Sequence, residues 1–230
     1  MTRLSIIVPV LNEPAIADHL ARLAPLRARG AQVVVVDGGS ADGTLERAKA
    51  FADLALSAPR GRAAQMNAGA AVARGKILLF LHADTDLPQN ADAMVDEVVA
   101  ARRRAWGRFD VRIAGRHPLL PVVAGMMNAR SRATGIATGD QAIFVTREAF
   151  SAVGGYPDQP LMEDIALSRS LKRLSPPVCL RAKVTTSGRR WETHGVLRTI
   201  LLMWRLRLAY RLGADPRRLA KTYGYRPVDA

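Results

Sequence analysis

The sequence predicts an α/β protein, a single domain built on one mostly parallel sheet flanked by helices. Short runs rich in β-branched residues alternate with longer segments of helical periodicity through the first half of the chain. The 230 residues are 49% hydrophobic, which is enough for one buried core and argues against a disordered chain. Polar clusters follow three of the expected strands directly, at the place where open parallel sheets bind ligands.

The first half of the chain has the βαβ alternation of a parallel sheet. The last of its strands contains no polar residue after Lys76, as expected of a strand that is buried on both faces. We expect strands at residues 4–10, 32–36, 54–57 and 76–81, and helices at 16–28, 42–50 and 62–74.

The pattern is weaker in the second half, but it contains no repeat, linker or low-complexity segment that would mark a second domain. One of the expected helices is stopped by Pro176 and Pro177. We expect strands at 106–113, 142–145 and 178–184, and helices at 88–104, 119–132, 163–174 and 196–212, with a short helix after residue 145.

The charge and cysteine content limit the partners and the compartment. The chain has 34 basic and 20 acidic residues, a net charge of +14 that favours phosphates, nucleic acid or acidic lipid without choosing among them. The lone Cys179 excludes an internal disulfide and is expected to be buried, and it suits a reducing compartment, so we expect a cytoplasmic protein. Residues 4–10 are too short for a secretory signal, and the arginines within 196–212 make a membrane span costly.

The most informative cluster follows the strand that ends at Leu81 and reads HADTD over residues 82–86. Carboxylates at a sheet edge are oxygen ligands with which a divalent cation could bind a diphosphate, and Asp84 is the central candidate. The alternative is that Asp84 or Asp86 only caps the following turn. The cluster alone leaves both interpretations open.

A second cluster reads DGGSADGT over residues 37–44. Its glycines permit a close backbone approach, and an acid at a strand end can accept hydrogen bonds from a ribose or a base, which makes Asp37 the ligand candidate. The segment has neither the Walker nor the GxGxxG spacing. We expect Asp42 to cap the next helix.

Several segments, taken in order, resemble the motifs of family 2 glycosyltransferases. The first four read SIIVPVLNE at 5–13, VDGGSADGT at 36–44, GRAAQMNAG at 61–69 and FLHADT at 80–85. A GGY at 154–156 followed by Glu163 and Asp164 resembles the acceptor-side segment of that family. The resemblance covers about residues 4–175, and the whole pattern is similar to a small soluble subgroup associated with radical-SAM genes.

The resemblance implies a single GT-A domain over residues 1–230. Its parts would be a nucleotide-sugar-binding half at 1–87, an acceptor-side half at 88–190 and a helical C-terminal extension at 191–230. The donor would be a nucleotide-diphosphate sugar, by default a UDP-sugar, and the transfer would invert the anomeric centre.

The resemblance also implies residue roles. Asp84 would hold Mn²⁺ or Mg²⁺ against the donor diphosphate, and Asp164 would be the base that accepts the proton of the acceptor hydroxyl. The residues assigned to substrate and nucleotide binding are Pro9, Glu13, Asp37, Arg62, His82, Arg190 and Trp191.

Two departures from the family pattern affect these roles. His82 replaces the first acid of the usual Asp-x-Asp, which leaves open whether His82 or Asp86 joins the metal site. Residues 187–191 read SGRRW and lack the Gln of the processive enzymes, so we expect transfer of a single sugar. Arg190 is a candidate for the diphosphate and Trp191 for stacking on an acceptor ring, with a surface Arg and a core Trp as the alternative.

Two other functions compete with sugar transfer. A sugar nucleotidyltransferase shares a related fold but opens with a Gly-rich basic loop, where this chain has residues 9–13. A basic protein that binds membrane or nucleic acid without catalysis is the other, although acids at three strand ends would repel a phosphate backbone, so we expect no nucleic acid. Segment 196–212 rests on a membrane surface, covers the acceptor cleft or packs on the core, and the sequence leaves these three open.

Overall fold

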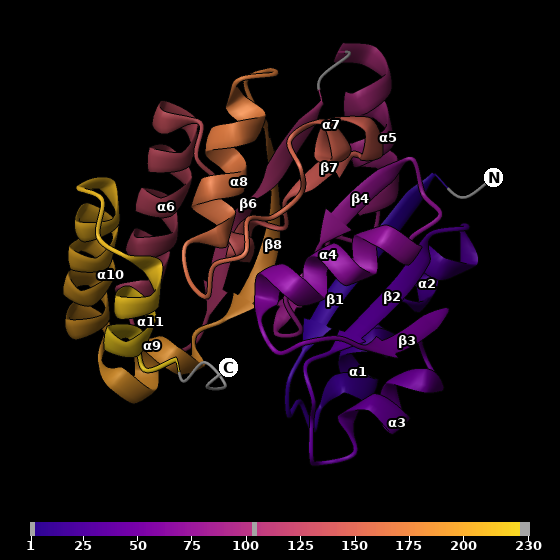
Figure 1. The fold of residues 1–230 in the computed structure, drawn as a ribbon, viewed down its shortest axis with the longest axis horizontal. Helices are drawn as coiled ribbons and strands as arrows, with labels where there is room; N and C mark the ends of the chain where they lie inside the picture. The colour runs from indigo at the N-terminus through magenta and orange to yellow at the C-terminus, as the bar shows by residue number, and fades with distance from the viewer. Residues whose placement is uncertain (1–2, 103–104, 226–230) are drawn as a thin grey trace.

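A computed structural model describes residues 3–102 and 105–225, and its centre is an eight-stranded sheet (Figure 1). The strand order is β3-β2-β1-β4-β7-β6-β8-β5. The strands are β1 (Leu4–Val10), β2 (Gln32–Asp37), β3 (Leu54–Ser57), β4 (Ile77–Phe80), β5 (Thr85–Asp86), β6 (Trp106–Ala114), β7 (Phe144–Thr146) and β8 (Val178–Ser187).

Helices cover both faces of this sheet and extend beyond one side of it (Figure 1). They are α1 (Ile16–Ala21), α2 (Ala24–Ala28), α3 (Thr44–Lys49), α4 (Arg62–Val72), α5 (Ala91–Arg102), α6 (Leu120–Thr134), α7 (Arg147–Ala152), α8 (Glu163–Lys172), α9 (Arg189–His194), α10 (Val196–Arg211) and α11 (Pro216–Tyr223), with a 3₁₀ turn, η1, at Gly139–Gln141.

The predicted parallel sheet is confirmed in the first half of the chain. Strands β3, β2, β1 and β4 run parallel, and the register places Val10 opposite Asp37. The short β7 then pairs antiparallel with both β4 and β6, whereas β6 and β8 are parallel to each other. The carboxyl ends of β1, β2 and β4 therefore lie at one edge of the sheet, as their polar clusters predicted.

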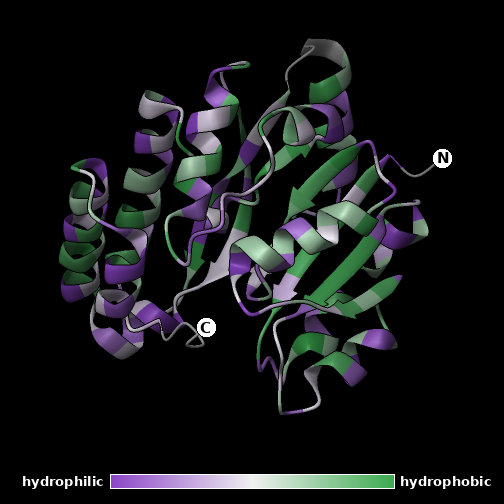
Figure 2. Ribbon diagram, in the orientation of Figure 1, coloured by the Kyte–Doolittle hydropathy of each residue, from purple (hydrophilic) through white to green (hydrophobic). Residues whose placement is uncertain are grey.

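Side chains of β1 alternate between two core layers, one on each face of the sheet. Ile6 and Val8 pack with Leu20 of α1 on one face, and Ile7 packs with Met66 of α4 on the other. All seven residues of β1 are buried, and Figure 2 shows the central strands as the most hydrophobic part of the ribbon. Each fully buried aliphatic side chain contributes about 1.5–3 kcal/mol, so these layers hold the site's framework rigid.

The far end of the sheet curls back toward β4. Only residues 81–84 separate β4 from β5, yet four strand spacings separate the two in the strand order. These residues form a turn, since the Thr85 amide donates to the His82 carbonyl at 3.1 Å. A flat sheet would need about 19 Å at that point, which a turn cannot span. The sheet therefore bends, and the Ser187 amide reaches the Asp84 carbonyl at 3.1 Å.

The C-terminal helices form a third hydrophobic cluster with the segment that enters α8. Leu206 of α10 and Leu219 of α11 pack with Leu161, Met162 and Ile165. Within the described residues, no helix is long and apolar enough to cross a membrane.

Several predicted elements differ from the observed ones. The helix expected at 16–28 is two helices, since the chain turns before Pro25 in the first turn of α2. The strand expected at 142–145 begins only at Phe144, because Ala142 has a left-handed φ of 45°. The helix expected at 88–104 begins at Ala91, and its last two residues lie outside the described part of the chain. Cys179 is half-buried rather than buried.

Candidate active site

The loops after β1 and β2 are joined by hydrogen bonds. The Asn12 amide donates to Ser40 Oγ at 2.8 Å, and the Ala41 amide donates to Asn12 Oδ1 at 3.0 Å. The Glu13 amide donates to Thr44 Oγ1 at 2.9 Å. Two of the three predicted clusters therefore form one surface at the edge of the sheet.

The carboxylate of Asp37 organises its own loop. Its Oδ2 accepts hydrogen bonds from the Gly39 and Ser40 amides at 2.9 and 2.8 Å, and its Oδ1 accepts the Ser40 hydroxyl. Asp42 Oδ1 accepts the Thr44 amide at 3.0 Å, but the N-cap of α3 is Gly43, so Asp42 lies one residue before the capping position expected for it. Pro9 is buried within β1. Nucleotide contacts by Pro9 and Asp37 stay predictions.

The third cluster places Asp84 at the surface, in the turn between β4 and β5. Its side chain is exposed, and its Oδ1 accepts the Thr85 hydroxyl at 3.3 Å. Burial raises the pKa of Glu13; the charge of Arg189 opposes that shift, and the charge of Asp84 adds to it. Glu13, Asp84 and Arg189 are therefore electrostatic neighbours, and the Arg189 neighbourhood was not predicted.

Asp86 is engaged elsewhere, since its Oδ1 lies 2.6 Å from Arg22 Nε. The described residues contain no group of three or more His, Cys, Asp or Glu side chains arranged to hold a metal ion. A cation at Asp84 would therefore need ligands from a bound molecule.

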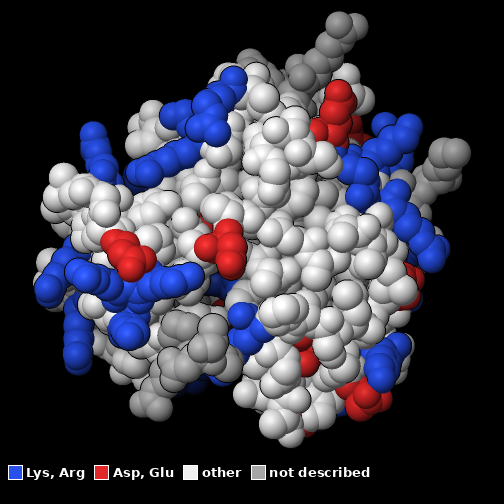
Figure 3. Space-filling model, in the orientation of Figure 1, with Lys and Arg blue, Asp and Glu red and all other residues white. Residues whose placement is uncertain are grey.

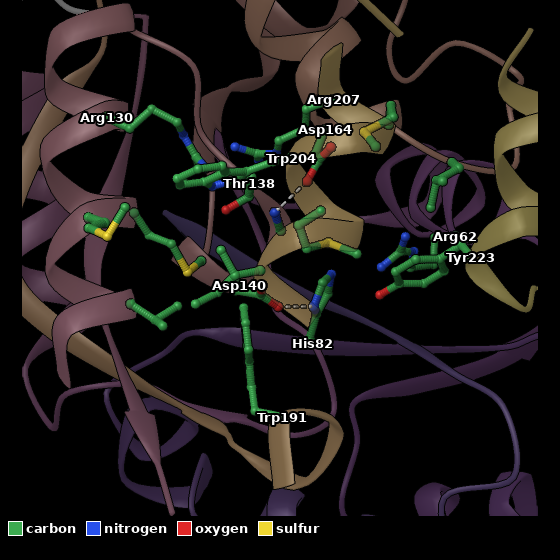
Figure 4. Close-up of a pocket in the computed structure, with 18 residues that line it drawn as sticks. Arg62, His82, Arg130, Thr138, Asp140, Asp164, Trp191, Trp204, Arg207 and Tyr223 are labelled. Atoms are coloured by element: carbon green, nitrogen blue, oxygen red, sulfur yellow. Dashed lines mark hydrogen bonds and ion pairs between the residues drawn. The ribbon is translucent and has the colours of Figure 1, made fainter. Parts of the chain in front are cut away.

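A cavity of about 410 Å³ lies beside this edge, between α6, η1, α8 and α10 (Figure 4). Asp164 lies in its wall and accepts the Gly139 amide at 2.9 Å and its neighbour Ile165's amide at 2.7 Å. Met162, with a left-handed φ of 64°, turns the chain into α8 just before it. Residues that line the cavity include Arg62, His82, Met126, Met127, Arg130, Thr138, Gly139, Asp140, Met162, Asp164, Trp191, Met203, Trp204, Arg207 and Tyr223.

His82 faces this cavity and pairs with Asp140, with 3.3 Å between Nδ1 and Oδ1. Burial alone would lower the pKa of His82, but the hydrogen bond and charge of Asp140 outweigh it, so the pKa is raised. The ring also packs on backbone, because a Cβ placed on Gly139 would lie 2.4 Å from its Cε1 and Nε2. His82 is thus fixed between Asp140 and the backbone of η1.

The turn η1 that supplies Asp140 has a local cause in the sequence. Thr138 and Gln141 form a capping box, in which the Thr138 amide donates to Gln141 Oε1 at 3.2 Å. Sequence reasoning missed Asp140, although the T-x-x-Q spacing at 138–141 is a detectable signal for this turn.

Arg62 and Glu163 form an ion pair behind the cavity, with 2.9 Å between Nε and Oε1. Glu163 is only 3% exposed, and burial raises its pKa despite the guanidinium. The charge of Glu163 raises the pKa of Arg62. Of the two adjacent acids in the Glu-Asp motif, the cavity is lined by Asp164 and not by Glu163.

Arg190 and Trp191 have different surroundings. The Arg190 guanidinium lies 3.7 Å above the Tyr223 ring, and its Nη2 donates to the Tyr223 carbonyl at 3.1 Å. Trp191 lines the cavity and also packs against the core. The diphosphate contact of Arg190 and the stacking role of Trp191 stay predictions.

The parallel half-sheet with polar loops at its carboxyl ends and a carboxylate-bearing cavity beside it characterises a glycosyltransferase of the GT-A fold. The model of "Glycosyl transferase family 2" matches residues 5–119, half of the chain, and the protein belongs to this family. The resemblance to the radical-SAM-associated subgroup stays a prediction.

Solved structures share this fold. Residues 1–349 of TarS from S. aureus align with a TM-score of 0.64 at 18% identity, over 81% of this chain and 61% of that one. The mannosyltransferase PcManGT from Pyrobaculum calidifontis, in complex with GDP-Man and Mn²⁺, aligns at 0.63 and 22% over 94% and 66%. Glucosyl-3-phosphoglycerate synthase from Mycobacterium tuberculosis, with Mn²⁺, UDP and glucosyl-3-phosphoglycerate, aligns at 0.60 and 20% over 80% and 71%.

The chain spans less than two thirds of the length of the first two of these structures. At these identities the likeness concerns the fold. No curated protein matches the sequence.

Proposed function

We propose that the protein transfers one sugar from a nucleotide-diphosphate donor to an acceptor hydroxyl, with inversion and without processive extension. The observation that carries this proposal is Asp164, a carboxylate fixed by two backbone amides in the wall of a cavity next to the strand-end loops. A base held in this way needs little reorganisation when it accepts the hydroxyl proton. Family membership favours sugar transfer over the nucleotidyltransferase and binding-protein alternatives.

The donor side would be formed by the loops after β1, β2 and β4, with Glu13 and Asp37 toward the nucleotide. The hydrogen bond and charge of Asp140 raise the pKa of His82, which favours the protonated ring and suits it to neutralise negative charge between donor and cavity. UDP is the default nucleotide because it is common in the family, and structural neighbours with UDP and with GDP-Man support both bases. A cytoplasmic location stays part of the proposal.

Asp84 would hold the divalent cation, Mn²⁺ or Mg²⁺. The residues fit this type of ion, because Mg²⁺ is commonly bound by one or two carboxylates together with substrate phosphates. Asp84 is exposed, and among the described residues its Oδ1 accepts only a long hydrogen bond of 3.3 Å, from the Thr85 hydroxyl. When bound, the ion would supply charge neutralisation on the leaving nucleoside diphosphate.

A thermal-shift screen tests the donor side directly. UDP, GDP, dTDP and CDP are added with and without Mn²⁺ or Mg²⁺ to wild type and to Asp84→Ala. We expect stabilisation by one diphosphate that requires the metal and is lost in the variant. At a ligand concentration about 100 times the Kd, the free energy of unfolding should rise by about 2.7 kcal/mol. No stabilisation by any diphosphate would overturn the proposed function.

We further propose that α10 rests on an anionic membrane surface. Its large apolar side chains form a stripe at spacings of three and four residues, with exposures of 57–78% at Leu197, Leu201, Trp204, Leu208 and Leu212. The helix carries arginines and no acidic residue, and Figure 3 shows basic side chains gathered on this side of the molecule. An apolar stripe flanked by basic residues is typical of helices that lie in the membrane interface.

Co-sedimentation with vesicles tests this second proposal. Wild type should bind vesicles that contain phosphatidylglycerol and not vesicles of phosphatidylcholine alone. Leu201→Gln with Leu208→Gln should remove binding, whereas Leu174→Gln, at a leucine outside the stripe that is 50% exposed, serves as the control. Binding that is unaffected by the double substitution would contradict a membrane role for α10.

A further inference from the structure

Arg130, a half-buried residue, brings a positive charge to the cavity and forms no ion pair with the residues that the structure describes. Its side chain extends from α6 into the cavity (Figure 4). Its Nε and Nη2 are buried and have no hydrogen-bond partner among the residues that the structure describes. These two nitrogens carry three of the five N–H donors of a group that stays charged, so leaving them unpaired away from water is costly.

Nearby carboxylates do not remove this cost. Burial lowers the pKa of Arg130, and the charges of Asp164 and Asp140 only partly oppose the shift. No carboxylate lies within 4.0 Å of the guanidinium in the described part of the chain, whereas Arg62 in the same cavity has its ion pair. Two unpaired buried nitrogens give this guanidinium little stabilising role in the fold, which favours a role for its charge in binding a ligand.

The position of Arg130 assigns that ligand to the acceptor. Arg130 lines the same cavity as Asp164, and Arg207 lies in the wall as a second cation. Asp84, the expected site of the donor diphosphate, is not part of this lining. An anion bound by Arg130 is therefore on the acceptor side of the base.

The remaining wall around Arg130 is apolar and adaptable. It includes Met126 and Met127 from α6 and Met203 and Trp204 from α10. Methionine and tryptophan side chains make extensive contacts with apolar surfaces of varied shape. A fully polar acceptor would leave this wall without a partner.

We infer that the acceptor is an amphipathic anion. Its phosphate or carboxylate binds the guanidinium of Arg130, its apolar body lies against the methionine and tryptophan wall, and its hydroxyl is thereby presented to Asp164. This inference rests on the proposed function and names the substrate class of the same site.

Binding of simple probes tests the inference without knowledge of the natural acceptor. The probes are n-octyl phosphate, octanoate, n-octanol and inorganic phosphate, followed by the fluorescence of Trp191 and Trp204, which both line the cavity. Octyl phosphate or octanoate should bind at least about tenfold more tightly than octanol, since a charge-assisted hydrogen bond contributes that much. The stronger of the two identifies the anion.

The variants are Arg130→Met, Arg130→Lys and the control Arg181→Met, which removes an exposed charge outside the cavity. Arg130→Met should lose the tenfold preference for the anion and keep the binding of octanol, and Arg130→Lys should restore part of it. The melting temperature of Arg130→Met should stay the same as that of wild type or rise. A lower melting temperature would assign Arg130 a structural role and overturn the inference.

Further outcomes separate the two levels of the proposal. Equal binding of octanol and octyl phosphate would overturn the anion site, and inorganic phosphate that binds as tightly as octyl phosphate would overturn the apolar part. Either result, with metal-dependent stabilisation by a nucleoside diphosphate intact in the same protein, leaves the proposed transferase function standing. Loss of that stabilisation in wild type would refute the function itself.

Discussion

Replacing Gly139 by alanine should displace His82 and thereby disturb both halves of the site. The new Cβ would lie 2.4 Å from Cε1 and Nε2 of the ring, whereas ordinary contacts begin at 3.4 Å. The φ of Gly139 is not left-handed, so alanine is strained only by this contact. The imidazole must therefore retreat by about 1 Å, and a displacement of this size in an active site can lower turnover about 100-fold.

The displacement also has an effect that needs no substrate. Moving the ring weakens its pair with Asp140, 3.3 Å away, so the raised pKa of His82 should fall toward 6.5. Because the folded pKa is raised, the stabilisation from this pair is present below the unfolded pKa and is lost as pH rises through the folded value. Proton NMR titration of the histidines measures the change directly, and overpacking should lower stability by about 1–3 kcal/mol.

The matched control is Gly125→Ala in α6, where a Cβ would meet nothing within 4 Å. There alanine should stabilise the protein by about 0.5–1 kcal/mol, because glycine inside a helix is unfavourable. An unchanged His82 pKa together with unchanged stability in Gly139→Ala would refute the reasoning, since it would mean that the ring does not rest on the backbone of η1.

Three other predictions follow from the same contacts. Asp164→Asn should lower transfer by 10²-fold or more with metal-dependent donor binding retained in calorimetry, and unchanged turnover would exclude it as the base. Arg62→Met should cost about 2 kcal/mol in urea unfolding by stranding the buried Glu163, and adding Glu163→Gln should recover most of that loss. Burial lowers the pKa of His19 to about 4. The contribution of the neutral ring to the free energy of unfolding is therefore present above pH 6.5 and is lost as pH falls toward 4. Urea unfolding at pH 7 and pH 5 should differ by about 2 kcal/mol more in wild type than in His19→Leu, and equal differences would show that His19 is not buried as a neutral ring.

The parts of the fold that sequence predicted best are those with a strong local pattern. The run from Leu4 to Val10 and the four consecutive valines of β2 have no stable alternative to a buried strand. The two-residue strand β5 was not predicted, because Thr186, the partner of its Thr85, lies 101 residues away along the chain. No periodicity within so short a segment indicates such pairing.

The candidate site likewise contains residues that a local sequence motif predicted and residues that no local pattern indicated. Asp84 and Asp164 were predicted because they sit within motifs that resemble a family, whereas Arg130 is one of 34 basic residues with no local distinction. What distinguishes Arg130 is that its buried Nε and Nη2 find no hydrogen-bond partner within residues 3–102 and 105–225, which only the tertiary structure reveals. Asp140 was not predicted either, because its role depends on contact with His82, which is distant in sequence and adjacent in space.

The curl of the sheet has a consequence for how the protein acquires its site. The segment that carries Asp84 is fixed by β5, whose ladder partner β8 ends at Ser187. A growing chain that has completed β1 to β4 therefore has the framework of the proposed donor site, but it cannot fix the segment that carries Asp84 until more than a hundred further residues have emerged. Contacts of such long sequence separation slow folding. The segment that carries Asp84 is therefore among the last parts of the site to be fixed, although the strands beside it come first in the chain.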